Sequence, residues 1–264
     1  MRPWLEIVIP ARNEERRLPA GLTELSAAAA ALPPCITIVV VDNASDDRTA
    51  DIVREWPAGE VPVRLLRCDR PGKGAAVRAG LLATSAPYVG FCDADMATDP
   101  VAIAAAARLL RAGHPVVLGS RSHPGSDVED RHTVIRRAGA AVFRAATRVI
   151  VPDVADTQCG FKFFRGEIAR AAAAQLRVTG FAFDVELIAR CVQLGATPVE
   201  IPVRWRDVSG STFSVWRHSA SSFAELALAW RALRSAPAAA APDTTGWSTD
   251  TPAAPVALGG TEVP

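Results

Sequence analysis

The sequence predicts an α/β fold with a mainly parallel central sheet and helices on both of its faces. Apolar, β-branched runs alternate along residues 1–234 with Ala-rich or amphipathic segments of helical length. Strands joined through helical crossovers run parallel, and both faces of such a sheet are buried. Hydrophobic residues make up 49% of the 264, which is enough for one substantial core.

The expected elements follow from these patterns in chain order. Short apolar runs predict strands over residues 5–10, 36–42, 61–68, 88–92 and 115–119. Longer Ala-rich or amphipathic segments predict helices over residues 14–31, 46–56, 73–84 and 100–112. Further helical patterns cover residues 131–148 and 214–233, and another helix is expected to begin near Phe183.

One domain is expected over residues 1–234, followed by a tail. Residues 235–264 are dominated by Ala, Pro, Thr and Gly and contain almost no large aliphatic side chains. Such a segment cannot bury enough apolar surface to offset the entropy of ordering. We therefore expect residues 235–264 to be a disordered tail.

Composition and charge argue against several classes of protein. The net charge of +1 and the lack of a DNA-reading motif disfavour a nucleic-acid partner. The five cysteines are widely spaced without a CxxC pair, which is typical of reduced thiols in a cytosolic protein. No secretory signal and no run of about 18 apolar residues occur. We expect a cytoplasmic protein, soluble or peripherally bound at the inner face of the cell membrane.

Polar side chains cluster where four of the predicted strands end. They lie at residues 12–14, 42–47, 69–74 and 93–95. Parallel sheets bind ligands outside the carboxyl ends of their strands, so these clusters predict one shared site. Asn13 and either Ser45 or Asp46 have an alternative role as helix N-caps, which is compatible with ligand binding.

The pair Asp93 and Asp95 is the strongest candidate in this set. Two carboxylates one residue apart at a strand end repel each other unless a cation lies between them. Oxygen ligands suit Mg²⁺ or Mn²⁺, and such an ion usually carries a substrate phosphate. The alternative is a solvated turn at the strand end.

A second candidate is the Gly72-Lys73-Gly74 segment, which opens a predicted helix. Backbone amides and the helix dipole at such a position bind phosphate. The segment is not a Walker P-loop, because Ala75 stands where the magnesium-binding Ser or Thr would be. The 29 basic residues of the chain include two lysines, Lys73 and Lys162, and both lie in motif-like segments.

Seven motifs occur in the order expected of a known family. IPARNEE at 9–15, VDNASDDRT at 41–49, GKGAA at 72–76, DAD at 93–95 and GSR at 119–121 resemble family-2 glycosyltransferases of the GT-A fold. DTQCGFK at 156–162 and FAFDVEL at 181–187 resemble the dolichyl-phosphate glucosyl- and mannosyltransferase branch, the first motif being most similar to the glucosyl type. The resemblance covers about residues 4–215.

The resemblance implies a nucleotide-sugar site, with UDP-glucose or GDP-mannose as the donor. Mg²⁺ or Mn²⁺ on Asp93 and Asp95, the carboxylates that flank Ala94, would neutralise the diphosphate leaving group. Lys73, Arg121 and Arg206 would contact the phosphates, although Thr212 stands where relatives carry a lysine. The base and ribose would be held by Pro10, Arg12, Glu14, Val41, Asp42 and Asn43.

The acceptor implied by the resemblance is a polyprenyl phosphate at the membrane surface. Residues 131–148 hold five arginines and no acid, with apolar residues interleaved at helical spacing. Arg131 and Arg136 are the residues expected to bind the acceptor phosphate. The alternative is a surface helix with a solvated charged face.

Asp95, Arg121, Asp156 and Asp184 are the catalytic candidates. Asp156 would orient the acceptor or the sugar, and its alternative role is to cap the following turn. Either Asp184 or Glu186 is expected to face the sugar hydroxyls. An acceptor phosphate is already ionised at neutral pH, so catalysis would depend on positioning and electrostatics.

These residues predict an inverting, metal-dependent hexosyltransferase. A first rival interpretation keeps the fold and donor but changes the acceptor to a soluble metabolite or glycan. A second is a sugar nucleotidyltransferase, which the motifs at 156–162 and 181–187 disfavour. A third is a non-catalytic, membrane-associated binding protein.

Overall fold

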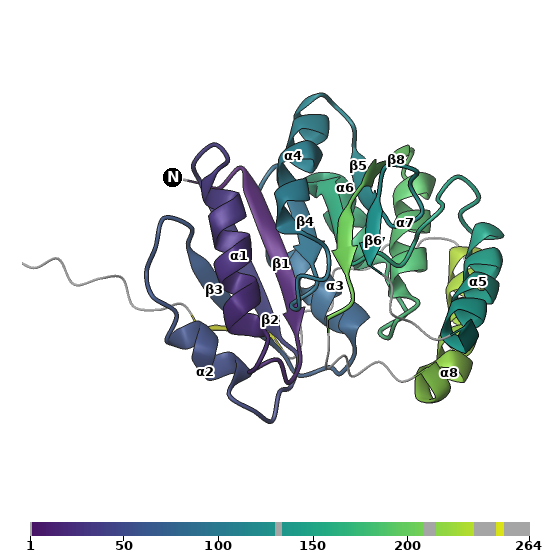
Figure 1. Ribbon diagram of the computed structural model, residues 1–264, viewed down its shortest axis with the longest axis horizontal. Coiled ribbons are helices and arrows are strands. Elements are labelled where there is room, and N and C mark those ends of the chain that lie inside the picture. The colour runs from purple at the N-terminus through teal and green to yellow at the C-terminus, as the bar shows by residue number, and fades with distance from the viewer. Residues whose placement is uncertain (1, 130–133, 209–214, 235–246, 251–264) are drawn as a thin grey trace, which may run out of the picture.

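The computed structural model describes residues 2–129, 134–208, 215–234 and 247–250. Its eight-stranded sheet has the order β10-β3-β2-β1-β4-β7-β5-β8 (Figure 1). These strands are β1 Leu5–Ala11, β2 Ile36–Asp42, β3 Val63–Cys68, β4 Tyr88–Cys92, β5 Val116–Ser120, β7 Phe161–Arg165, β8 Pro198–Pro202 and β10 Trp247–Asp250. A separate parallel pair consists of β6 Asp127–Glu129 and β9 Arg204–Arg206.

Helices cover both faces of the sheet, as the sequence predicts. The face that carries Ile7 and Ile9 of β1 packs against α1 Leu18–Ala30, α2 Thr49–Arg54 and α4 Ile103–Arg111, the last preceded by the 3₁₀ turn η1 Pro100–Ala102. The opposite face, with Val8, packs against α3 Lys73–Ala83, α6 Gly166–Ala174 and α7 Phe183–Gln193. Alternate side chains of one strand thus enter two separate cores.

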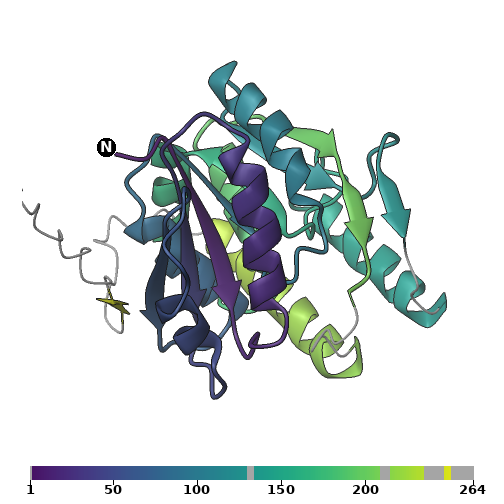
Figure 2. The same ribbon diagram turned by 60° about the vertical axis from the view of Figure 1, so that its left-hand side comes forward.

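Two further helices lie together beyond this layer. α5 Val134–Arg148 contacts α8 Val215–Arg234, and α8 also packs against α7. The ring centroids of Phe143 on α5 and Phe223 on α8 are 5.5 Å apart. Figure 1 shows α5 and α8 at the end of the molecule away from α2, and Figure 2 gives a second view of the same arrangement. Among the described helices, none is both long and apolar enough to cross a membrane.

Two strands depart from the parallel order, β7 inside the sheet and β10 at its edge. β7 runs antiparallel between β4 and β5, with Gly90 opposite Phe163 and Phe91 opposite Lys162. Gly90 is needed in this arrangement because a side chain there would overlap the Phe163 ring. The expected mainly parallel sheet is therefore confirmed, and β7 is a strand that the sequence patterns did not predict.

Most of the expected tail lies outside the described residues. Trp247–Asp250 form β10, which pairs antiparallel with Leu65–Cys68 of β3. For these four residues the structure shows a strand where the sequence predicts disorder. Since β3 would otherwise be the edge strand, its free backbone groups provide the hydrogen-bond partners for β10.

The close contact between β4 and β7 gives a test of the fold. We expect Gly90→Ala to lower the free energy of unfolding by about 2 kcal/mol, because the new methyl group meets the Phe163 ring. In a Phe163→Leu background the same change is expected to cost less than half as much. Urea denaturation of the four proteins measures the difference. Equal costs in both backgrounds would contradict the packing described here.

Candidate active site

The site lies where the loops after β1, β2, β3 and β4 meet at one edge of the sheet (Figure 1). The register places Ala11 opposite Asp42, and Asp42 opposite Arg67. Left-handed backbone occurs in three of these loops, at Asn13 (φ 55°), Ala44 (φ 51°) and Met96 (φ 46°). Such conformations are costly for residues other than glycine and often occur at functional sites.

The loops after β1 and β2 hold each other in place. The backbone N–H of Asp46 donates to Asn13 Oδ1 (2.9 Å), and that of Asn13 donates to Ser45 Oγ (3.1 Å). The N–H of Glu15 donates to Asp47 Oδ2 (3.0 Å). Asn13 and Ser45 therefore join two loops instead of capping their own helices. Arg12, between these contacts, is exposed, while Pro10 is half-buried.

Asp42 is a buried carboxylate with one oxygen left without a partner among the described residues. Its side chain is 2% exposed, and Arg67 Nε lies 3.8 Å from Oδ2. The other oxygen, Oδ1, is buried without a hydrogen-bond partner among the described residues. A buried carboxylate oxygen in that state is costly, and a donor from a ligand would satisfy it. The side chain of neighbouring Val41 instead points into the core.

The side chain of Asn43 is hydrogen-bonded within the protein. Its Nδ2 donates to the carbonyls of Cys68 (3.0 Å) and Arg70 (2.7 Å), and its Oδ1 accepts from the N–H of Gly72 (2.8 Å). These three bonds use both amide hydrogens and the oxygen. Asn43 therefore fixes the loop that leads into α3, and its amide is already engaged within the protein.

The carboxylates Asp93 and Asp95 face two basic side chains. Lys73 Nζ, at the start of α3, lies 2.5 Å from Asp93 Oδ1, and Arg17 Nη1 lies 3.5 Å from Asp95 Oδ2. Burial, followed by the negative charge of Asp93, raises the pKa of Asp95. Burial opposes the charge of Lys73, but the surrounding carboxylates, Asp93 first, raise its pKa. Together with Glu14, which Arg17 also contacts, the cluster holds three carboxylates against two basic groups, and a cation would balance the remaining negative charge.

These two carboxylates fit a divalent ion. Mg²⁺ is usually bound through one or two carboxylates together with substrate phosphates, so a larger set of protein ligands is not required. Within the described residues no group of three His, Cys, Asp or Glu side chains could hold a metal. Ala94, between the two acids, is buried against α1, where Gly21 leaves room for its carbonyl.

Two residues that the sequence patterns did not single out complete this cluster. Arg17 also donates to both oxygens of Glu14, at 2.7 and 2.6 Å. Gly160 accepts from the N–H of Asp93 (3.0 Å), and any side chain at 160 would overlap the Asp93 carboxylate. The three-residue spacing between Glu14 and Arg17 could have indicated the role of Arg17. The role of Gly160 depends on the pairing of β4 with β7, which local sequence does not reveal.

Arg121 and Asp156 form a two-pronged ion pair. Arg121 Nε donates to Asp156 Oδ2 (2.7 Å) and Nη2 to Oδ1 (2.9 Å), and its backbone N–H adds a third bond. Despite burial, the Arg121 hydrogen bond and charge lower the pKa of Asp156 to about 2. The guanidinium also lies 5.6 Å from the centre of the Trp205 ring. Asp156 therefore orients Arg121, and it also accepts from the N–H of Gln158.

The structure separates Asp184 from Glu186. Glu186 is buried and accepts from the N–H groups of Arg177 and Val178, both at 2.9 Å, so it stabilises the segment before α7. Asp184 Oδ1 accepts from Lys162 Nζ (2.6 Å) and is 3% exposed. Of these two acids, Asp184 is the one that acts on Lys73, but its side chain is buried inside the protein.

The remaining predicted residues have different outcomes. The backbone N–H of Arg206 donates to Ala97 O (2.8 Å), two residues after Asp95, while its exposed side chain lies 3.7 Å from Glu129. Arg131 lies outside the described residues, as does Thr212. Arg136 belongs to α5, but its side chain is not among those described.

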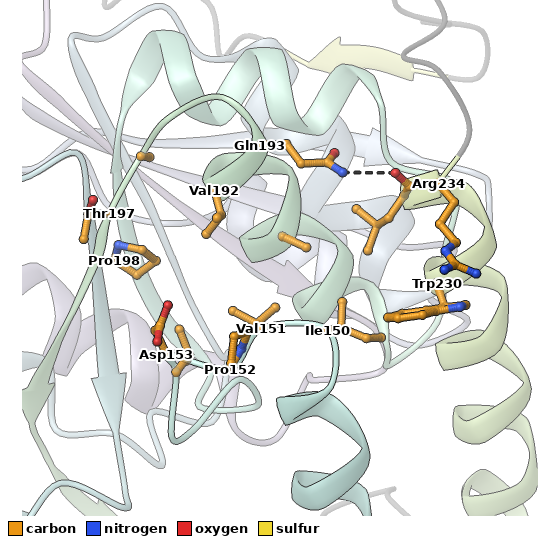
Figure 3. Close-up of a pocket in the computed structure, with 14 residues that line it drawn as sticks. Ile150, Val151, Pro152, Asp153, Val192, Gln193, Thr197, Pro198, Trp230 and Arg234 are labelled. Carbon is orange, nitrogen blue, oxygen red and sulfur yellow. Dashed lines mark hydrogen bonds between the residues drawn. The ribbon is translucent and has the colours of Figure 1, made fainter.

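A cavity of about 320 Å³ lies elsewhere, between α7, α8 and the segment after α5 (Figure 3). It is lined mainly by apolar side chains, including Ile150, Val151, Pro152, Val192 and Trp230. No predicted site residue lines it. The strand-end loops, which carry the charged groups, are therefore the better candidate for an active site.

Comparison with known proteins identifies the family of this chain. The model of the family described as glycosyl transferase family 2 matches residues 6–171. The chain is 34% identical over 223 residues to dolichyl-phosphate beta-glucosyltransferase of Drosophila melanogaster, covering 78% of this chain and 68% of the relative. The protein of the same name from Homo sapiens is 30% identical over 224 residues, with the same coverage.

Solved structures show the same fold. Glucosyl-3-phosphoglycerate synthase from Mycobacterium tuberculosis, in complex with Mn²⁺ and UDP-glucose, superposes with a TM-score of 0.62. It is 21% identical, and the match covers 86% of this chain and 79% of that one. The complex of that enzyme with Mg²⁺ and UDP has a TM-score of 0.60. The chain therefore belongs to glycosyl transferase family 2, and it is a glycosyltransferase of the GT-A fold.

Proposed function

We propose that this protein transfers glucose from a nucleotide sugar to a polyprenyl phosphate at a membrane surface, with inversion at the anomeric carbon. The observation that carries the proposal is the cluster of Asp93, Asp95, Lys73 and Arg17 at the sheet edge. It supplies a metal site and positive charge for a diphosphate. The names of the relatives support glucose and a polyprenyl phosphate acceptor.

Separate residues act on the leaving diphosphate of the donor and on the phosphate of the acceptor. A divalent ion held by Asp93 and Asp95 supplies a Lewis acid for the leaving diphosphate. Asp42 accepts a hydrogen bond from the base or ribose through its free Oδ1. Arg121, held by Asp156, places positive charge near the reacting phosphates. The acceptor phosphate is already an anion, so the chain has only to orient it.

The α5–α8 surface supports a membrane-bound acceptor. Val142 and Val149 on and just after α5 are 60% and 68% exposed, and Leu228 on α8 is 49% exposed. Exposed apolar side chains beside arginines are typical of helices that lie in a bilayer interface. This surface would bring the protein to a lipid acceptor as a peripheral membrane protein.

Transfer of labelled sugar tests the proposal. Purified protein is incubated with Mn²⁺, polyprenyl phosphate and either UDP-[¹⁴C]glucose or GDP-[¹⁴C]mannose. We expect label from UDP-glucose to enter the organic phase. Label that appears only in a water-soluble product, with 3-phosphoglycerate or a glycan as acceptor, would favour the soluble-acceptor alternative and overturn the proposal.

Removal of one metal-site carboxylate is expected to abolish turnover. Asp95→Ala leaves a single carboxylate, so the ion can no longer be held on the diphosphate. Initial rates across a Mn²⁺ titration measure the effect. Asp99→Ala is the matched control, because Asp99 is a nearby acid that caps η1 and pairs with Arg204. Metal-dependent turnover by Asp95→Ala would show that the pair is not the metal site.

Asp156→Asn is expected to reduce turnover and stability together. The pKa of Asp156 is about 2 in the folded protein, against about 3.9 in an unfolded chain. Its contribution is therefore present above pH 4 and is lost as the pH falls through 2, and it amounts to about 2 kcal/mol. Urea denaturation of both proteins at pH 7 and pH 3 checks this. A stability difference that does not shrink at pH 3 would contradict the assignment.

The α5–α8 surface can be tested separately from the chemistry. Val142→Asp/Val149→Asp is expected to weaken binding to anionic phospholipid vesicles by about tenfold, because two apolar contacts are lost. Val101→Asp is the control, since Val101 on η1 is 70% exposed and belongs to the opposite helix layer. Vesicle co-sedimentation measures both variants. Equal binding by the two would rule out this surface.

A further inference from the structure

Lys162 is a buried lysine whose charge the proposed reaction does not use. It is the second residue of β7 and is 0% exposed. Its Nζ donates to the Cys159 carbonyl (2.5 Å) and to Asp184 Oδ1 (2.6 Å), and lies 5.1 Å from the centre of the Phe91 ring. Burying a charged pair is expensive, so a pair at this position calls for a functional explanation.

The pair lies directly behind the metal-site lysine. The start of α3 packs closely on the start of α7 and on the residues before it. A Cβ at Gly74 would overlap the Phe183 side chain, and one at Gly72 would overlap the Thr179 carbonyl. This contact brings Lys73, which opens α3, near Asp184 in the first turn of α7. Lys73 in turn reaches Asp93. Four groups of alternating charge thus follow one another inward from the site: Asp93, Lys73, Asp184 and Lys162.

Lys73 presents a difficulty for metal binding. Its ammonium occupies Asp93 Oδ1, one of the oxygens that a divalent ion needs. A metal ion and Lys73 therefore compete for the same carboxylate. Lys73 releases Asp93 more readily when other anions balance its charge. The substrate diphosphate is one such anion, and Asp184 is the buried carboxylate that acts on Lys73 from the protein side.

We propose that Lys162 and Asp184 are positioning residues whose buried pair keeps an ionised carboxylate behind Lys73, so that Asp93 becomes available to the divalent ion. The inference rests on the proposed nucleotide-sugar and metal site. Lys162 keeps Asp184 ionised and oriented, and Asp184 holds Lys73. The charged groups that face Asp184 are Lys162 from β7, Lys73 from α3 and Asp93 after β4. Glu186, on its own helix, is engaged elsewhere.

Binding of Mn²⁺ in the presence of UDP tests the inference without any acceptor. Asp184→Asn is expected to weaken Mn²⁺ affinity by about tenfold, because Lys73 then stays on Asp93. Lys162→Met is expected to weaken it similarly at the acidic end of a pH series, because burial raises the pKa of Asp184 and the loss of Lys162 raises it further. Its affinity should recover as the pH rises and Asp184 ionises, while that of Asp184→Asn should not. Isothermal titration calorimetry measures these affinities.

The double variant separates positioning from a purely structural role. Removing both charges of a purely structural pair is often neutral. If the pair were purely structural, Lys162→Met/Asp184→Asn would therefore bind Mn²⁺ like the wild type. We expect it instead to resemble Asp184→Asn. Arg190→Met is the matched control, because Arg190 pairs with buried Glu186 on the same helix but away from Lys73. It should lower the melting temperature without changing Mn²⁺ affinity.

Three results would overturn the inference. These are wild-type affinity in both single variants, wild-type affinity in the double variant, and loss of affinity in Arg190→Met equal to that in Asp184→Asn. Failure of the wild-type protein to glucosylate polyprenyl phosphate would overturn the proposed acceptor alone, because Mn²⁺ and UDP binding does not involve it.

Discussion

The repulsion between Asp93 and Asp95 is the constraint on which the rest of the site depends. Two acids at one strand end need compensating charge, and the chain brings it from separate elements. Arg17 comes from the start of α1 and Lys73 from the start of α3. Gly160 makes the arrangement possible by leaving space for the Asp93 carboxylate. A divalent ion would enter a site in which negative charge is already concentrated and only partly balanced.

A rigid frame surrounds this charged centre. Asn13 and Asn43 use their side-chain amides to fix backbone groups of neighbouring loops. Asp156 does the same for Arg121 through two parallel hydrogen bonds. Such preorganisation lowers the cost of orienting a substrate, which matters in the proposed reaction because its phosphate nucleophile needs no activation. The groups left with unsatisfied bonding capacity, such as Asp42 Oδ1, are then the ones available to ligands.

Much of this was predictable from local patterns, and the exceptions share a physical reason. Strand and helix positions, the edge that carries the site, and the Asp93–Asp95 pair follow from periodicity and from the geometry of parallel sheets. The antiparallel β7, the role of Arg17 and the separation of Asp184 from Glu186 do not. Each of these depends on contacts between segments far apart in the chain. Asn43 was hard to predict for the same reason. Its position in a motif does not reveal whether the side-chain amide contacts a ligand or a neighbouring loop.

The most direct test of the central claim is the position of the metal ion. Crystals of the protein grown with Mn²⁺ and UDP would be measured at a wavelength where manganese scatters anomalously. The account predicts one strong anomalous peak within coordination distance of Asp95 and Asp93, with Lys73 moved away from Asp93 toward Asp184. A manganese peak at a different group of residues, or UDP bound away from the loops after β1, β2 and β4, would contradict it.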